Sequence, residues 1–493
     1  NESTGAVDGV ARGAKLAFFD IGDSEGEIWV GPSVLMLSTG RMGDGEDPPH
    51  AHIHSASWGS RGNNQYTFQA RNFDVYMHDF DDFLAIAAVG NDGNGGTANT
   101  VWSPSTFKNG IAVGASHSYG EDLTGGQLGP AYVASFSSRG PTRDGRMAPH
   151  VVAPGRYILS SGALPNRVGE CDEGIPAPGQ ARGGLLSIQG TSMAAPVVAG
   201  TAALVWQYFV EGWYPNGRKG SGESIAPSGA LVKALLLNGA QTNMKGIDNG
   251  KGNVAPVFPY DNTIGFGRID LQKSLYIERW SDVQVKVWDR ENITDGESVQ
   301  YFVTIDKSNG CAFEQLSVTL VWMDPEVYLG CKECVVNDLD IIITRNESTD
   351  EVFYPNGRSS RDDTNNAERI VIADANDGDS FILNVTAFNL DSVTQQFALV
   401  ATGCFGGFAN NLDTSKNVFD NDDSLEKLSQ ELKKQRIIII TCSTLGAIVV
   451  IASLYLVYRR TRDHDSNDAM CRKWISFPCE TRNSNQGCVA EID

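Results

Sequence analysis

Residues 190–205 read GTSMAAPVVAGTAALV, and this stretch decides the fold. It follows a strand candidate at 185–188 and predicts a helix over 191–209 that is rich in small residues, with Ser192 in its first turn. Gly190 allows close backbone approach to a bound molecule, and the helix N-terminus offers unpaired N–H groups to developing negative charge. Ser192 is therefore a nucleophile candidate, although a helix cap is the commoner meaning of such a serine.

A second glycine-rich segment, AAVGNDG at residues 87–93, lies at the end of an apolar strand candidate at 83–89. Read alone, Gly-Asn-Asp-Gly is an ordinary turn. Taken by itself, the segment therefore predicts only a turn that follows a strand.

The pattern of apolar residues changes along the chain. From residue 9 to about 243, strand candidates at 14–19, 83–89 and 111–115 alternate with helical stretches, including one at 228–240, which predicts an α/β domain with a parallel sheet and helices on both faces. From about 283 to 403, short alternating strands separated by Asp, Asn and Gly turns predict an antiparallel sandwich or jelly roll. The expected boundaries are 1–280, 281–405 and, for a polar stalk, 406–436.

An uncharged apolar run at 437–458 is long enough to cross a bilayer as one helix, and a basic segment follows it. A buried core helix is the alternative. Sequons for N-glycosylation at Asn292, Asn346 and Asn384 all precede the run. We therefore expect a single-pass type I membrane glycoprotein with an extracellular or lumenal N-terminal part and a cytoplasmic tail at 459–493.

Charge and cysteine content narrow the partners and the compartment. The formal net charge of -21, without a clustered basic stripe before residue 420, argues against a nucleic-acid partner. Five cysteines precede the apolar run, at positions 171, 311, 331, 334 and 404. Since five is odd, one thiol is free, pairs with another chain, or has a partner absent from this sequence.

Several segments together resemble the subtilase family of serine endopeptidases. GTSMAAP at 190–196 is similar to the family's nucleophile signature, and AAVGNDG at 87–93 to its oxyanion segment. GVARGAKL at 9–16, FSSRGPT at 136–142 and HVVAPG at 150–155 resemble further family stretches, so the resemblance covers nearly all of residues 9–275.

The resemblance implies roles for individual residues. Ser192 would attack the peptide carbonyl through an acyl-enzyme, while Asn91 and the Ser192 backbone N–H would hold the oxyanion, a donor worth about 3 kcal/mol in subtilisin. Ser57, Trp58 and Gly59 would pair with the substrate backbone by strand addition, and Ala88 and Gly90 would also contact the substrate. Residues 57–59 and 87–89 would form the walls of the first pocket. Substrates would be proteins or peptides, and catalysis would need no cofactor.

The β region extends the resemblance. Residues 336–341, VNDLDI, and 320–324, LVWMD, are similar to motifs of alkaline subtilases that carry a C-terminal jelly roll. In those relatives acidic loops hold calcium, and the matching oxygen ligands here would be Asp338, Asp340, Asp362 and Asn365. Turn-forming, solvated acids are an equally good interpretation.

The sequence departs from the family at the catalytic base. A serine nucleophile needs a histidine and an orienting carboxylate, yet no histidine here lies in the family's HGT context. Asp20-Ile21-Gly22 superficially resembles the family's Asp motif, but it follows the position where the histidine is expected. We expect both residues upstream of Asn1, and we expect this chain alone not to hydrolyse peptides.

Three explanations fit that departure: an N-terminally truncated sequence, processing that removes the segment, or a catalytically dead membrane-anchored relative that binds peptides. The first also accounts for the missing signal peptide and the odd cysteine. Intact Ser192 and Asn91 speak against the third, because binding alone requires neither residue.

A metal-dependent hydrolase is a further alternative. His50, His52 and His54 alternate along one strand face and could chelate zinc. Such runs also occur on solvated loops, and no further ligand has suitable spacing.

Overall fold

The computed structural model describes residues 9–18, 21, 51–62, 64–118, 128–161, 181–182, 185–248, 254–345 and 351–406. The N-terminal part of these residues is built around a mixed sheet with the order β1-β2-β3-β4-β9-β10, in which β5 also pairs with β3. The strands are β1 (Ile53–Ala56), β2 (Leu84–Ala88), β3 (Ile111–Ser116), β4 (Tyr132–Val133), β5 (Val151–Pro154), β9 (Gly246–Asp248) and β10 (Val254–Ala255). Strands β1, β2, β3 and β5 run parallel, which confirms the predicted parallel α/β core.

The helices confirm the sequence pattern closely. They are α2 (Phe68–Asp79), α4 (Thr191–Val210), α5 (Gly229–Asn238) and the short α6 (Leu271–Ser274), with a 3-10 turn η1 at Asn94–Gly96. Ser228 caps α5 by accepting a hydrogen bond from the Leu231 backbone N–H at 2.9 Å. A small three-stranded sheet, β6 (Ile158–Ser161), β8 (Leu185–Ile188) and β7 (Ala181–Arg182), leads into α4.

One predicted strand is wrong in its described part. Residues 14–18 form no strand, and Leu16 and Phe18 are 92% and 90% exposed. An apolar run becomes a strand only when a neighbouring strand satisfies its backbone, and residues 14–18 pair with none of the described strands.

The C-terminal described part is an antiparallel sandwich, as predicted. One sheet has the order β11-β18-β13-β16 and the other β12-β17-β14-β15. Its elements are β11 (Gln284–Thr294), β12 (Ser298–Thr304), β13 (Leu316–Trp322), β14 (Asp338–Arg345), β15 (Val352–Phe353), the 3-10 turn η2 (Pro355–Gly357), β16 (Ala367–Ile372), β17 (Ser380–Asn389) and β18 (Thr394–Gly403).

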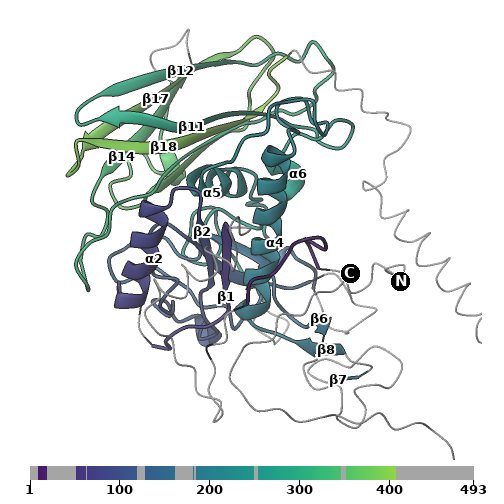
Figure 1. Ribbon diagram of the computed structural model, residues 1–493, viewed down its shortest axis with the longest axis vertical. Helices are drawn as coiled ribbons and strands as arrows, with labels where there is room; N and C mark the ends of the chain where they lie inside the picture. The colour runs from purple at the N-terminus through teal and green to yellow at the C-terminus, as the bar shows by residue number, and fades with distance from the viewer. Residues whose placement is uncertain are drawn as a thin grey trace, which may run out of the picture. The chain divides into compact units, whose positions relative to one another are not determined.

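Helix α5 lies between the α/β part and the sandwich and packs against both. Figure 1 shows α5 between β2 and the sandwich strand β18, and every residue of the helix is buried. The apolar core of the α/β part therefore continues into the sandwich through side chains such as Val321 and Val400. Both parts belong to one compact unit, Asn1–Leu412, while the exact boundary near residue 280 stays a prediction.

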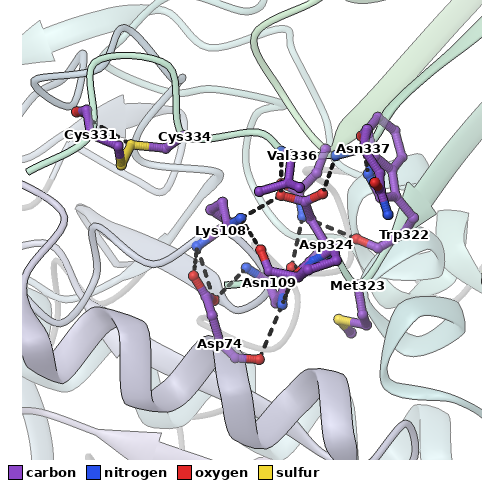
Figure 2. Close-up of polar contacts among 12 residues, drawn as sticks. Asp74, Lys108, Asn109, Trp322, Met323, Asp324, Cys331, Cys334, Val336 and Asn337 are labelled. Atoms are coloured by element: carbon purple, nitrogen blue, oxygen red, sulfur yellow. Dashed lines mark hydrogen bonds and ion pairs between the residues drawn. A yellow bond between two sulfur atoms is a disulfide. The ribbon is translucent and has the colours of Figure 1, made fainter. Parts of the chain in front are cut away.

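A buried polar network also joins the α/β part to the sandwich (Figure 2). The Lys108 ammonium group pairs with the Asp324 carboxylate, and both side chains are wholly buried. The Asn109 carboxamide donates to the Asp324 carbonyl at 2.9 Å and accepts from the Asp324 N–H at 2.8 Å. On the α/β side, the Asp74 carboxylate accepts from the Lys108 and Asn109 backbone N–H groups.

Two disulfides lie among the described residues. Cys311 pairs with Cys404, and Cys331 pairs with Cys334. The remaining cysteine before the apolar run, Cys171, lies outside the described residues. Because the other four are paired, Cys171 is the one that the odd count leaves over.

The predicted membrane span at 437–458 also lies outside the described residues, as do the predicted stalk and tail apart from residue 406. Within the described part, α4 is long and apolar enough to cross a membrane. However, α4 packs against β1, β2, β3 and β5, and its apolar character serves this contact in the core.

Candidate active site

Ser192 lies in the first turn of α4, and it is not the cap of that helix. Gly190 occupies the N-cap position and supplies no side-chain bond. Instead, the Asn91 Oδ1 atom accepts hydrogen bonds from the Thr191 backbone N–H at 2.9 Å and from the Thr191 hydroxyl at 3.2 Å. The first N–H group of the helix is therefore bonded by a residue about a hundred positions away, and the Ser192 side chain is not used as the cap.

These bonds orient the Asn91 carboxamide. Because Oδ1 faces Thr191, the Nδ2 donor remains available on the other side of the amide group. A Cβ atom built on Gly190 would lie 3.6 Å from Asn91 Nδ2 and 3.6 Å from the Ser192 backbone nitrogen. Asn91 Oδ1 lies 3.7 Å from the same position, so the three distances place the whole carboxamide next to the start of α4, at the positive end of a long helix.

Ser57 brings a third segment to this place. The Ser57 hydroxyl donates to the Ser192 carbonyl at 2.8 Å, and the Ser192 hydroxyl donates to the Ser57 carbonyl at 3.0 Å. Ser57 follows β1, Asn91 follows β2, and Ser192 opens α4. The ends of the parallel strands β1 and β2 thus lie next to the start of α4, the usual location of sites in α/β sheets.

Of the other residues predicted to contact substrate, Gly90 is bonded to the start of α4, and Trp58, Gly59 and Ala88 lie on the same chain segments as Ser57 and Asn91. Trp58 packs against Phe73 with ring centroids 6.3 Å apart, and Gly59 precedes Ser60, whose N–H donates to the Ser103 carbonyl at 2.7 Å. Ala88 ends β2, and Gly90 donates its N–H to the Thr191 hydroxyl at 3.2 Å. All seven residues predicted for catalysis and substrate binding lie on these three connected segments.

Sequence reasoning missed three residues beside the site. The Trp102 indole N–H donates to the Asp92 carboxylate at 2.8 Å, and Arg61 pairs with the same carboxylate at 2.8 Å. Asp92 directly follows Asn91 and could have been noticed from that position. No local pattern distinguishes Trp102 or Arg61.

The described histidines are engaged away from Ser192. Their contacts are His52 with Trp206 and Asp82, His54 with Phe73, His78 with Asp79, His117 with Asp248 and Arg156, and His150 with the Ala112 N–H. Burial lowers the pKa of His54 to about 4 and the pKa of His150 well below its ordinary value. Each of these described side chains is thus engaged with residues other than Ser192.

The zinc alternative gains no support from the described part. His50 lies outside the described residues, and no group of three or more His, Cys, Asp or Glu side chains within them could hold a metal ion.

The four residues predicted to bind calcium lie close together: Asp338 and Asp340 belong to β14, and the Asp362 backbone N–H donates to Asp340 Oδ1 at 3.1 Å. Arg361 pairs with Asp338 and contacts Asp340, while Arg358 pairs with Asp362 at 2.9 Å. Asn365 donates to Asp362 at 2.9 Å. Burial, together with the Asp338 charge, raises the pKa of Asp340 to about 6.

The comparisons with known proteins agree with the geometry. Residues 1–254 match the Subtilase family, which is more than half of the chain. The serine protease/ABC transporter B family protein tagD of Dictyostelium discoideum is 28% identical over 81% of this chain and 28% of its own length. Pyrolysin of Pyrococcus furiosus is 31% identical over 49% of this chain and 16% of its own length.

This chain spans less than a third of the length of either relative. Among solved structures, the match to the prenylagaramide maturation protease PagA includes 45% of this chain and 61% of the PagA chain. The sequence identity is 19% and the TM-score 0.30, a similarity too low to inform the site. The family match spans both the Asn91 and the Ser192 segments, and the chain therefore belongs to the subtilase family of subtilisin-like serine peptidases.

Proposed function

We propose that the protein is a serine endopeptidase in which Ser192 attacks the peptide carbonyl to form an acyl-enzyme. The Asn91 Nδ2 and the Ser192 backbone N–H would stabilise the oxyanion of the tetrahedral intermediate. The observation that carries the proposal is the 2.9 Å hydrogen bond from the Thr191 backbone N–H to Asn91 Oδ1, which holds the Asn91 carboxamide beside the residue that precedes Ser192. The hydroxyl of Ser192 belongs to the same helical turn.

The peptide substrate would lie along Ser57, Trp58 and Gly59 as an added strand. The Ser57 carbonyl now accepts from the Ser192 hydroxyl, so the serine would have to exchange this partner for a base before attack. Among the described histidines, the side chains contact residues other than Ser192, so the identity of this base stays a prediction.

One substitution and two reagents, a fluorophosphonate and a chelator, test this proposal on the full-length protein. Ser192→Ala should lower kcat by about 10⁶-fold, the loss measured when the nucleophile of subtilisin is removed. A fluorophosphonate should label the protein at Ser192, and a strong chelator should leave turnover unchanged. Ser308→Ala, in an exposed turn of the sandwich, is the matched control and should keep full activity.

The competing function is that of a dead relative that binds peptides. It predicts peptide binding by the full-length protein with neither turnover nor fluorophosphonate labelling. Robust, chelator-insensitive turnover by residues 1–493 alone would contradict the expectation that the base lies upstream.

Membrane anchorage in the type I orientation is part of the proposal. The apolar run at 437–458 supports it, and the name of the Dictyostelium relative likewise joins a serine protease to a transporter. Asn292 is exposed on β11, as a glycosylated residue must be. Resistance of the protein to alkaline extraction, and a mobility shift on deglycosylation that Asn292→Gln reduces, would test anchorage and orientation.

Calcium binding by the sandwich stays a prediction. As arranged, Arg361 engages both Asp338 and Asp340, and this donor set does not fit a calcium ion unless the guanidinium moves away. In favour of a cation, Glu368 Oε1 and Asp338 Oδ1 are buried without a hydrogen-bond partner in the described part. A higher Tm in calcium chloride than in chelator would support binding.

A further inference from the structure

The depth of the first specificity pocket can be derived from the two segments that form its walls. If the proposed function holds, on which this inference rests, the side chain on the acyl side of the scissile bond enters between residues 57–59 and residues 87–89. Gly59 ends the first of these walls, and Gly90 directly follows the second. What lies against these two glycines therefore decides how large that side chain can be.

Trp102 and Ser103 cross between the two walls. The Trp102 N–H donates to the Val89 carbonyl at 2.8 Å, and the Ser103 carbonyl accepts from the Ser60 N–H at 2.7 Å. Residues 102–103 are thus hydrogen-bonded to Val89 in one wall and to Ser60, directly after the other.

The Trp102 side chain lies directly on the two glycines. A Cβ atom on Gly90 would be 2.5 Å from the indole Cγ and Cδ2 atoms. A Cβ atom on Gly59 would be 3.2 Å from the Trp102 Cβ and 2.8 Å from the Ser103 carbonyl oxygen. Since even a methyl group on Gly90 would clash with the indole, the ring is packed directly against Gly90.

Hydrogen bonds hold the indole in this position. Its N–H donates to Asp92 Oδ2 at 2.8 Å, and Arg61 contacts both oxygens of that carboxylate, at 2.8 and 3.1 Å. The Asp92 backbone N–H donates to the Ser138 hydroxyl at 2.9 Å. Moving the ring aside would break a charge-assisted hydrogen bond, so a large substrate side chain cannot displace it cheaply.

We propose that Trp102 is the floor of the first pocket and restricts cleavage to peptide bonds that follow a small residue, namely glycine, alanine or serine. A phenylalanine ring would need the volume that the indole occupies. Even small differences in fit to such a pocket change kcat/KM by about tenfold or more.

The first experiment compares hydrolysis by the full-length protein of two peptides that differ only in alanine or phenylalanine before the scissile bond. The alanine peptide should have a kcat/KM at least about tenfold higher. Trp102→Ala should reverse the preference, whereas Trp102→Phe should keep it, because a ring still fills the floor. Trp213→Ala is the matched control: its indole also donates to a carboxylate, Glu211, at 3.1 Å, but it follows the far end of α4.

A second experiment separates failure of the pocket inference from failure of the proposed function. N-acyl product peptides that end in alanine or phenylalanine are titrated into the full-length Ser192→Ala protein by calorimetry, which needs no turnover. Tighter binding of the alanine peptide than of the phenylalanine peptide, with the order reversed when Trp102→Ala is added, supports Trp102 as the floor of the pocket. This result would hold even if the parent protein cleaves nothing. Preference for phenylalanine, equal binding, absence of binding, or insensitivity to Trp102→Ala overturns it.

Discussion

Lys108→Met tests whether the sandwich is an integral part of the α/β core. The Lys108 ammonium and the Asp324 carboxylate are each 0% exposed, and they pair across the boundary between the two parts. The substitution keeps the apolar stem of the side chain and removes its charge. The Asp324 carboxylate then keeps only its bonds from the Val336 N–H, at 2.9 Å, and the Asn337 N–H, at 2.8 Å.

The expected loss follows from the burial of this pair. Removing one partner of a buried ion pair costs about 3–5 kcal/mol, because the other charge is left uncompensated. Two backbone donors still stabilise Asp324, so we expect a loss of about 3 kcal/mol in the free energy of unfolding. Adding Asp324→Asn removes the stranded charge, and the double variant should be more stable than Lys108→Met alone.

Urea unfolding followed by circular dichroism measures both quantities. Because Lys108 belongs to the α/β part and Asp324 to the sandwich, helix and sheet signals should be lost in one transition that shifts as a whole. Lys332→Met, at an exposed lysine of the sandwich, is the control and should change stability by less than about 0.5 kcal/mol. A Lys108→Met loss below about 1 kcal/mol, or a shift of the helical transition alone, would refute the reasoning.

Three further predictions concern pH, the disulfides and the oxyanion donor. Burial lowers the pKa of His54 to about 4, so the stability that neutral His54 maintains above pH 6.5 is lost as the pH falls from 6.5 towards 4. Relative to His54→Leu, the parent should lose up to about 3 kcal/mol across this window in unfolding measurements at a series of pH values. Cys311→Ser opens a loop with a sequence separation of 93 residues, and should lower stability by about 4 kcal/mol in denaturant titrations; an unchanged midpoint would exclude a stabilising crosslink. In the full-length protein Asn91→Ala should lower kcat by about 10²–10³-fold with little change in KM, and an unchanged kcat would remove Asn91 from the oxyanion site.

The motifs that identify the family are short and contiguous, which is why the sequence was sufficient to predict them. Ser192 was expected in the first turn of a helix, and α4 begins at Thr191. Ser228 was expected at the start of the next helix, and it caps α5. Each prediction depends on residues a few positions apart, over which propensity and spacing act directly.

The predicted strand at 14–19 is wrong because strand formation, unlike a helix start, depends on a distant part of the chain. Its composition is that of a strand, but a strand forms only with a paired neighbour, and local composition carries no information about whether one is present. Leu16 and Phe18 accordingly remain exposed in the described structure.

By itself, then, the sequence determined the fold class, the family, and the identities of Ser192 and Asn91 as candidates. Only the tertiary structure decided that Trp102 lies on Gly59 and Gly90 and that Lys108 pairs with Asp324, a residue 216 positions further along the chain. Such contacts join segments with no common period or motif, because packing depends on which surfaces the folded backbone brings together.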